Sequence, residues 1–461
     1  MVLEEHIHNK IRATFKNDPD YHHFTGKDDL QKIGREDIEA FQLFMLNKII
    51  KYASEKSVFY KNLISSVGEV KTLRDITKIP FTDPNDLAQS PYKLMCLSMS
   101  QIARIFCHTT TGTTTGRLKK VFFTQYDTDR ISDTMAVIMG TVFDSAGLDL
   151  QNRVVQIFLP NNGPPHSMAG LIAKGAERFG GIPVLGDCTA TTREQIKAIE
   201  KARPDMLMGS AFRIWRITQE ASFLCDLSKI GVRTIFITSE YLSAPMRKRL
   251  KEQWHAEVFH HYGMTEPGFV IGVECQAHNG FHFNETELFF EAVDPESGKV
   301  LESEEEGELV LSTLDREGMP LIRYRTGDVA SIIRSPCQCG ATTLVRIGSI
   351  PKRIALVTTI GDHEKIYTSL LDEVMYDFPG LVDYRVIISS KNGKDAFTCQ
   401  VELLKKNEKT TEQVTRLLLA VPPIKKSIEA GLLLWPEIEI VDRGVLRRGG
   451  RTLKRRIKDT R

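Results

Sequence analysis

The chain has 461 residues, of which 26% are charged and 41% hydrophobic, and its formal net charge is +2. This length gives room for two or three domains, and the near-neutral charge argues against nucleic-acid binding. Residues 1–18 lack the apolar core of a secretory signal, and no stretch approaches the roughly 20 apolar residues of a membrane helix. Eight cysteines in a chain of this length do not form a disulfide scaffold, so we expect a cytoplasmic protein.

The first half of the sequence predicts helices and then alternating strands and helices. Apolar residues recur at helical spacing over 36–65, and three prolines over 78–91 favour an extended path. From residue 152 onward, short apolar runs alternate with helical patterns, which is typical of βαβ units and a sheet covered by helices on both faces. The expected strands span 153–160, 182–186, 205–210, 233–238 and 257–263, and the expected helices span 192–202 and 244–254.

The second half predicts strands first and a small α+β unit afterwards. Strands are expected at 289–301, 307–314 and 321–333. The unit after 350 combines expected strands at 354–359, 383–389, 396–403 and 435–441 with expected helices at 367–378 and 410–421. Gly, Ser and Pro cluster at 346–354, where we place the boundary. The expected fold is α/β, with a large layered domain over 1–348 and a small mobile α+β domain over 349–461.

The stretch "HTTTGTTTGRLKK", residues 108–120, has the composition of a phosphate-binding loop. Backbone N–H groups around glycines form an anion-binding concavity, and threonine hydroxyls add donors to it. The run lacks the Gly-Lys-[Ser/Thr] of a Walker loop, and a strand rather than a helix is expected after it. A flexible polar linker is the alternative. The candidate phosphate ligands are Thr110, Thr111, Gly112, Thr113, Thr114, Thr115 and Gly116, with Lys119 at the rim.

Four further motifs follow at ordered intervals: "SEYLSAPMRKRL" (239–250), "HHYGMTEPG" (260–268), "LIRYRTGDVA" (321–330) and "LRRGGRTLKRRIKD" (446–459). With them, the chain resembles the adenylate-forming enzyme superfamily and, within it, the phenylacetate–CoA ligase subfamily. The resemblance covers nearly the whole chain. The Tyr-Gly-x-Thr-Glu and Tyr-Arg-Thr-Gly-Asp motifs are specific in combination.

The resemblance implies that a carboxylic acid, with an aryl acid as the expected one, attacks Mg-ATP to form an acyl-adenylate and pyrophosphate. A thiol then takes the acyl group. The hydroxyl-rich loop would hold the β- and γ-phosphates. Tyr262 would stack on adenine, Asp328 would bind the ribose, Thr265 would contact the α-phosphate and Glu266 would bind Mg²⁺. The resemblance also places four further residues in the nucleotide site: Ser239, Glu240, His261 and Gly263. These roles suit a highly charged transition state, which needs positioned donors and a metal. Loop residues without a ligand are the alternative for Glu266 and Asp328.

The chain departs from the family pattern at two places. The hydroxyl-rich loop carries one extra residue, which loop closure tolerates. At the interdomain hinge, Gly348-Ser349-Ile350-Pro351-Lys352 lacks the family's arginine and aspartate, so Arg346 or Arg353 is expected to support the ribose. Pro351 would stiffen this hinge. Coenzyme A is the default acceptor, and a carrier-protein thiol or an amine stays open.

The basic tail is expected to supply a catalytic charge. Family members end in a Gly-Lys segment whose lysine reaches the α-phosphate and the carboxylate, and here Gly450-Arg451 and Lys454 are the candidates. Residues 451 and 454 face opposite sides of an extended strand, so only one can point into the site. We predict that Lys454 takes the role, with Arg451 as the alternative.

A second set of residues has the chemistry of a structural zinc site. Three thiols and one imidazole make a closed tetrahedral set, and here they are Cys275, His282, Cys337 and Cys339. Unrelated loop residues, with His278 as a competing ligand, are the alternative.

Two rival functions remain open at this point. One is an adenylating enzyme that passes the acyl group to a carrier protein or an amine. The other is a noncatalytic relative that binds nucleotide through Tyr262, Glu266 and Asp328. The sequence does not name the acid or the oligomeric state, and a homodimer is one option.

Overall fold

A computed structural model describes residues 1–65, 67–109, 118–149, 151–161, 167–446 and 457–461. The chain divides into two compact units. Unit 1 comprises Met1–Asn152, Gly163–Ile182 and His261–Ser349, and unit 2 comprises Arg153–Asn162, Pro183–His260 and Ile350–Arg461. Residues 350–461 therefore cluster with part of the preceding α/β segment.

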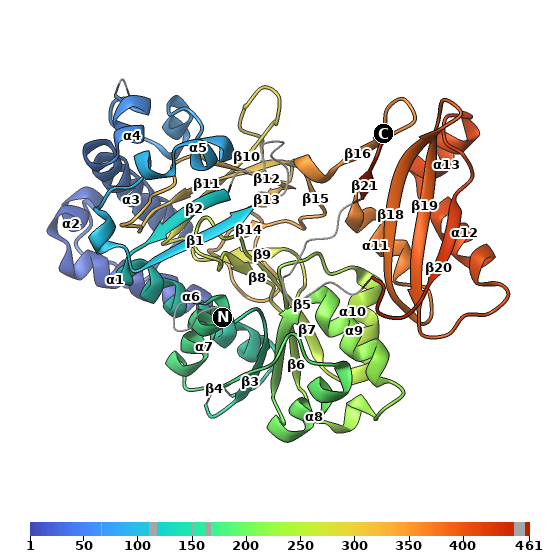
Figure 1. Ribbon diagram of the computed structural model, residues 1–461. Helices are drawn as coiled ribbons and strands as arrows, with labels where there is room; N and C mark the ends of the chain where they lie inside the picture. Colours follow the sequence, from blue (N-terminus) through green and yellow to red (C-terminus); the bar gives the residue numbers. More distant parts are fainter. Residues whose placement is uncertain (66, 110–117, 150, 162–166, 447–456) are drawn as a thin grey trace. The chain divides into compact units, whose positions relative to one another are not determined.

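Unit 1 has most of its helices in its N-terminal part and most of its strands in its C-terminal part (Figure 1). The helices are α1 (Val2–Asn17), α2 (Pro19–Thr25), α3 (Arg35–Lys56), α4 (Val58–Leu63), α5 (Pro84–Gln89), α6 (Gln125–Ser145) and α7 (Met168–Arg178). The strands are β1 (Arg104–Thr109), β2 (Leu118–Phe123), β8 (Gly272–Val273), β9 (Phe281–Phe283), β10 (Leu288–Val293), β11 (Gly307–Thr313), β12 (Tyr324–Ala330), β13 (Ile332–Ile333) and β14 (Arg346–Ile347).

Two strand arrangements position the functional side chains of unit 1. The antiparallel hairpin β1–β2 pairs from Arg104↔Phe123 to Thr109↔Leu118, so its two strands flank residues 110–117. Strands β10, β11 and β12 form an antiparallel sheet, and β11 and β12 are nearly free of exposed residues. Polar side chains on these strands must therefore find partners inside the unit.

Unit 2 holds a parallel sheet with helices, followed by an α+β segment. Its α/β part consists of β3 (Val154–Phe158), α8 (Thr192–Ala202), β5 (Met206–Ser210), α9 (Ala211–Ala221), β6 (Thr234–Thr238), α10 (Ala244–Trp254) and most of β7 (Glu257–Tyr262). The last two residues of β7 belong to unit 1. Strand β4 (Ile182–Leu185) begins with the last residue of a unit 1 segment and continues in unit 2. Strands β3, β5, β6 and β7 pair in parallel, in that order. Strands β5 and β6 are buried along their whole length, as expected for a sheet covered on both faces.

The α+β segment of unit 2 is built on an antiparallel hairpin of long strands. Its strands are β15 (Lys352–Arg353), β16 (Thr358–Ile360), β17 (Glu364–Ile366), β18 (Leu381–Lys391), β19 (Lys394–Leu403), β20 (Glu437–Val441) and β21 (Lys458–Asp459), and its helices are α11 (Thr368–Met375), α12 (Thr410–Leu419) and α13 (Pro422–Glu429). The sheet order is β20–β19–β18–β21, with α12 and α13 beside it (Figure 1).

The α/β class and the five predicted strands between 153 and 263 are confirmed. Helices α8 and α10 begin and end at the predicted residues. The extended path predicted for 78–91 is wrong in part, because α5 occupies Pro84–Gln89. Asp83 caps this helix and Pro84 takes its first position, where a missing N–H costs nothing.

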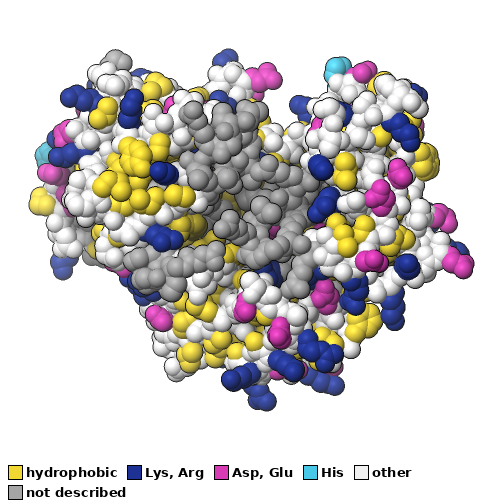
Figure 2. All heavy atoms as spheres, in the orientation of Figure 1, with side chains coloured by type: hydrophobic (Ala, Val, Ile, Leu, Met, Phe, Trp, Pro, Cys, Tyr) yellow, Lys and Arg dark blue, Asp and Glu magenta, His cyan; other side chains and the backbone are white. Residues whose placement is uncertain are grey.

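No helix in the described part of the chain is long and apolar enough to cross a membrane. Basic and acidic side chains are interspersed over the face shown in Figure 2. This distribution matches the near-neutral charge of the sequence.

Candidate active site and metal centre

Lys119, Glu266 and Tyr324 form a buried polar triangle in unit 1. The Lys119 ammonium lies 2.9 Å from Glu266 Oε1 and 2.9 Å from the Tyr324 hydroxyl. The Tyr324 hydroxyl in turn donates to Glu266 Oε1 over 3.1 Å. All three side chains are buried, so Lys119 and Glu266 form an ion pair inside the unit. The predicted magnesium ligand is thus fixed by β2 on one side and by β12 on the other.

Tyr262 and Asp328 form a second buried pair. The Tyr262 hydroxyl donates to Asp328 Oδ2 over 2.8 Å, joining the end of β7 to β12. Tyr262 is only 8% exposed and Asp328 only 5%. The residue predicted to stack on adenine and the residue predicted to bind ribose are therefore held by one hydrogen bond.

Every residue of the Tyr-Arg-Thr-Gly-Asp motif makes a polar contact. Arg325 pairs with Glu308, which also accepts from the Gly327 N–H over 3.0 Å. Gly327 has φ +75°, a conformation that glycine adopts without cost. The Thr326 hydroxyl accepts from the Asp328 N–H over 3.0 Å. Tyr324 and Asp328, the first and last residues of the motif, are both buried.

Gly263 and Thr265 lie in the turn between β7 and Glu266. A Cβ at Gly263 would lie 2.0 Å from the Phe269 carbonyl oxygen, so a side chain cannot be accommodated there. The Thr265 carbonyl accepts from the Gly268 N–H over 3.2 Å, which closes the turn. His261 is buried and pairs with Val273 of β8. These contacts place Gly263 and His261 as residues that shape the turn.

Ser239 and Glu240 follow β6 in unit 2. Ser239 has φ +73°, an unusual conformation for a residue with a side chain and one that is common at functional sites. Glu240 accepts from the Phe212 N–H at the start of α9 over 3.1 Å, and His260 Nε2 lies 2.8 Å from the Glu240 carbonyl oxygen. This turn is therefore fixed by the neighbouring helix and strand.

The hydroxyl-rich loop, Thr110–Gly116, and both tail candidates, Arg451 and Lys454, lie outside the described residues. Their predicted roles stay predictions.

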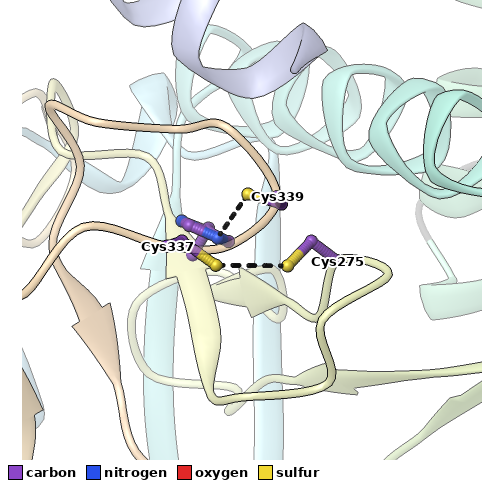
Figure 3. Close-up of side chains that lie close together, drawn as sticks. Cys275, Cys337 and Cys339 are labelled. Carbon is purple, nitrogen blue, oxygen red and sulfur yellow. Dashed lines mark hydrogen bonds between the residues drawn. The ribbon is translucent and has the colours of Figure 1, made fainter.

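Cys275, His282, Cys337 and Cys339 come together in unit 1, with their ligand atoms all within 4.8 Å of one another. The Sγ atoms of Cys275 and Cys337 are 3.6 Å apart, and Cys339 Sγ lies 3.5 Å from His282 Nε2 (Figure 3). His278, the competing ligand, places Nδ1 3.4 Å from Glu274 Oε2. Three sulfurs and one imidazole nitrogen at this spacing are the donor set that a tetrahedral Zn²⁺ takes.

The thiols of this cluster have unequal acidity. Burial raises the pKa of Cys275 to about 12. Burial also acts to raise the pKa of Cys337, but hydrogen bonds from His282 and from the Cys339 backbone outweigh it and lower that pKa to about 6. The contacts of Cys337 thus favour its thiolate, the form that binds a metal.

Arg346 braces the two loops that carry this cluster. Its Nη1 donates to the Asn279 carbonyl and its Nη2 to the Ser335 carbonyl, each over 2.8 Å. Asn279 lies between Cys275 and His282, and Ser335 precedes Cys337. The guanidinium is buried, and both terminal nitrogens donate to these loops. The ribose contact predicted for Arg346 or Arg353 stays a prediction.

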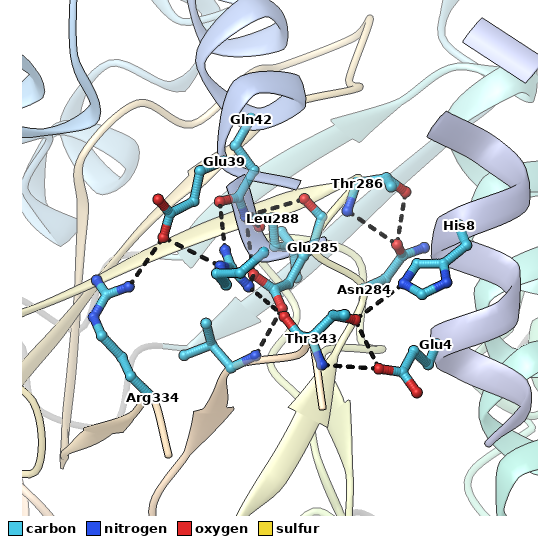
Figure 4. Close-up of polar contacts among 12 residues, drawn as sticks. Glu4, His8, Glu39, Gln42, Asn284, Glu285, Thr286, Leu288, Arg334 and Thr343 are labelled. Carbon is cyan, nitrogen blue, oxygen red and sulfur yellow. Dashed lines mark hydrogen bonds and ion pairs between the residues drawn. The ribbon is translucent and has the colours of Figure 1, made fainter. Parts of the chain in front are cut away.

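A polar network links the segment after Cys339 to the N-terminal helices (Figure 4). Glu4 of α1 accepts from the N–H groups of Thr342 and Thr343, over 3.1 and 3.0 Å. Glu285 accepts from the Val345 N–H over 2.8 Å and pairs with Arg35 of α3 at 2.7 Å. The backbone N–H groups that follow the cysteine turn are thereby bound by two carboxylates.

Sequence reasoning missed Tyr324, although Tyr324 and Thr326 alternate along one strand and so share a face. It also missed the partnership between Lys119 and Glu266, which are 147 residues apart. The period of two along "YRTGD" was the available signal for Tyr324.

Comparison with known proteins gives relatives over most of the chain. No protein-family profile matches it. Several phenylacetate–coenzyme A ligases are similar, and that of Thermus thermophilus is 26% identical over 392 residues, covering 81% of this chain and 83% of the relative. The indoleacetate–lysine synthetase of Pseudomonas savastanoi is 25% identical over 232 residues, covering 48% of this chain and 52% of the relative.

The fold is shared with a solved ligase. A 2-hydroxyisobutyryl-CoA ligase, crystallised in its postadenylation state with 2-HIB-AMP, superposes with a TM-score of 0.77 at 20% identity. The similarity covers 92% of this chain and 90% of that structure.

Proposed function

The chain is a homologue of the phenylacetate–coenzyme A ligases, and from this premise we propose that it is an AMP-forming acid–thiol ligase. The enzyme activates a carboxylic acid with ATP as an acyl-adenylate and releases pyrophosphate. It then transfers the acyl group to coenzyme A and releases AMP. The observation that carries the proposal is the Tyr262–Asp328 hydrogen bond of 2.8 Å. Tyr262 stands four residues before the buried Glu266, which pairs with Lys119.

Tyr262 and Asp328 bind the adenosine part of ATP in this proposal. The tyrosine ring offers an aromatic face to the base, and the carboxylate offers two acceptor oxygens to the ribose hydroxyls. Their mutual hydrogen bond fixes the distance between the base site and the ribose site. Binding then orders few additional groups, which lowers its entropic cost.

Glu266 is the proposed Mg²⁺ ligand, and Thr265 the proposed α-phosphate contact. Mg²⁺ takes hard oxygen ligands and keeps several waters, so one buried carboxylate fits its needs. When bound, the ion neutralises phosphate charge. Lys119 and Tyr324 hold the carboxylate in place, and Lys119 adds a positive charge on the side where phosphates would bind.

The phosphate loop and the tail complete the proposal. Thr110–Gly116 would bind the β- and γ-phosphates, and Ser239 and Glu240 would belong to the nucleotide site. Lys454, or alternatively Arg451, would contact the reacting carboxylate and the α-phosphate. Residues 349–461 would form a domain that moves between the two half-reactions, with 1–348 as the larger domain.

Zn²⁺ is the proposed occupant of the cysteine cluster. Cys275, His282, Cys337 and Cys339 supply four protein ligands, so the ion would have a closed coordination sphere and a structural role. It would fasten the loop after β8 to the turn before β14. Arg346 supports the same two loops through their carbonyl groups.

An aryl acid is the proposed substrate and coenzyme A the proposed acceptor, in the cytoplasm, where both ATP and coenzyme A are available. An amine acceptor is the second candidate, because one relative, similar over 48% of this chain, is an indoleacetate–lysine synthetase. A carrier-protein thiol and a homodimeric assembly are further alternatives.

The acceptor is tested by supplying Mg-ATP and phenylacetate with coenzyme A or with lysine in separate reactions. Product masses and AMP release are measured in each. We expect a coenzyme A thioester and stoichiometric AMP in the first reaction and no amide in the second. An amide without a thioester would replace coenzyme A by an amine as the acceptor.

A further inference from the structure

Glu402, near the end of β19, has a fully buried carboxylate that bonds to two other segments of unit 2. Its oxygens accept from Arg216 Nη1 at 2.7 Å and from Arg216 Nη2 at 3.2 Å. They also accept from the Gly444 N–H at 2.9 Å and from the Leu446 N–H at 3.1 Å. A buried carboxylate is costly unless it is paired and hydrogen-bonded, and these four bonds meet that need.

Arg216 gives this carboxylate a rigid counter-charge. It lies on α9, whose adjacent Trp215 is buried and donates from Nε1 to the Leu381 carbonyl of β18 over 3.1 Å. Arg216 Nη1 also contacts Glu220 one helical turn away, at 3.1 Å. Because a bidentate guanidinium–carboxylate pair is directional, α9 fixes the orientation of the Glu402 carboxylate as well as its charge.

The other two bonds fix the backbone at the base of the basic tail. Gly444 has φ +87°, so the chain turns there, and Leu446 is buried. In sequence, residues 447–456 come next and include both tail candidates, Arg451 and Lys454. Beyond them, β21 pairs with β18 at Ile387↔Lys458, and the Thr460 N–H donates to the Ile388 carbonyl over 2.9 Å.

The geometry points to Glu402 as a positioning residue for adenylation. Its carboxylate holds the backbone at Gly444 and Leu446 against Arg216, and so fixes the point from which the basic tail departs. The inference rests on the proposed function, because it needs a basic side chain of that tail to act on the reacting phosphate. A small displacement of a catalytic group lowers the rate strongly while leaving substrate binding intact.

Three variants separate this role from general stability. Glu402→Gln keeps the size of the side chain but removes its charge. Glu220→Gln is the matched control, because Glu220 also accepts a close hydrogen bond from Arg216. The Gly444 and Leu446 N–H groups bond to Glu402 and not to Glu220. Glu402→Asp keeps the charge but shortens the reach, and it carries the test if Glu402→Gln does not fold.

The readouts are amide hydrogen exchange at residues 444 and 446, ATP affinity, and the rate of acid-dependent pyrophosphate–ATP exchange. For Glu402→Gln we expect faster hydrogen exchange at both residues, at least a tenfold loss of pyrophosphate–ATP exchange, and ATP affinity within twofold of wild type. Glu402→Asp should show a smaller loss, and Glu220→Gln should match wild type in all three.

Two results would overturn the inference. One is an unchanged pyrophosphate–ATP exchange rate in Glu402→Gln, and the other is an equal loss in Glu220→Gln. If the wild type exchanges no pyrophosphate with any acid, the proposed function fails and the positioning role falls with it. Hydrogen exchange at 444 and 446 would still show whether Glu402 anchors this backbone.

Discussion

The Lys119 ammonium lies 2.9 Å from Glu266 Oε1, in a buried pair that joins the strand after the hydroxyl-rich loop to the proposed magnesium ligand. Both residues are buried, so removing either one leaves the other in a poorly solvated position without this partner. The pair therefore connects β2 to the residue proposed to bind magnesium.

Lys119→Met should destabilise the protein by about 3–5 kcal/mol, because it leaves Glu266 buried without its lysine counter-charge. It should also abolish pyrophosphate–ATP exchange. The adjacent Lys120, which is only partly buried and contacts the Tyr92 hydroxyl at 3.0 Å, gives the matched control. Lys120→Met should change the free energy of unfolding by less than about 0.5 kcal/mol. Equal denaturant midpoints for the two variants would contradict the buried pair.

Glu266→Gln should lower the free energy of unfolding, because it leaves the Lys119 ammonium buried without its counter-charge. It should also raise the Mg²⁺ concentration needed for half-maximal exchange, because it removes one anionic oxygen ligand. A magnesium titration of the pyrophosphate–ATP exchange rate measures this. An unchanged magnesium dependence would remove Glu266 from the metal site.

Tyr262→Phe should weaken ATP binding by about 0.5–1.5 kcal/mol, since the ring is kept but the hydrogen bond to Asp328 is lost. Asp328→Ala should weaken ATP binding by about 2–3 kcal/mol, because hydrogen bonds to a charged acceptor are stronger than those to a neutral one. Calorimetry on both single variants and the double variant gives their coupling. Strictly additive losses would show that the hydrogen bond does not serve nucleotide binding.

Cys275→Ser should release bound zinc and lower the free energy of unfolding by about 2 kcal/mol or more, since a structural metal contributes to folding directly. Cys225→Ser, which alters a half-buried cysteine outside the cluster, is the control. Metal analysis and thermal unfolding measure both effects. A purified wild-type protein without stoichiometric zinc would end the zinc assignment.

Acid should destabilise the wild type partly through Glu402. Burial acts to raise the pKa of Glu402, but its bonds to Arg216, Gly444 and Leu446 hold that pKa below its ordinary value. Because the folded-state pKa is depressed, the stabilisation is present above the unfolded-state pKa, about 4.3, and is lost as the pH falls through the folded value. Glu402→Gln should therefore narrow the difference in free energy of unfolding between pH 7 and pH 3. An identical difference in Glu402→Gln and wild type would contradict this.

Local sequence signals determine the elements that were predicted well. Thr191 and Glu194 form a capping box at the start of α8, and His255 in a left-handed conformation ends α10. The prolines over 78–91 predicted an extended path where α5 forms, because a proline that follows a capping aspartate can begin a helix.

The site was predictable only where a motif carried it. Tyr262, Glu266 and Asp328 stand in motifs, and the cysteine cluster followed from ligand type. The Lys119–Tyr324 contact joins residues 205 positions apart, and a strand pattern gives no register between distant strands. The backbone contacts of Arg346 with Asn279 and Ser335 had no sequence signal, and the ribose contact expected of Arg346 or Arg353 stays a prediction.

The central claim, acid activation through an acyl-adenylate, is tested most directly by exchange of labelled pyrophosphate into ATP. The purified protein is incubated with Mg-ATP and labelled pyrophosphate, with and without aryl, fatty and amino acids. We predict label in ATP only when an acid is present, highest with an aryl acid such as phenylacetate, and lost in Lys119→Met. ATP binding without acid-dependent exchange for any acid would contradict the claim and would identify a noncatalytic nucleotide-binding relative.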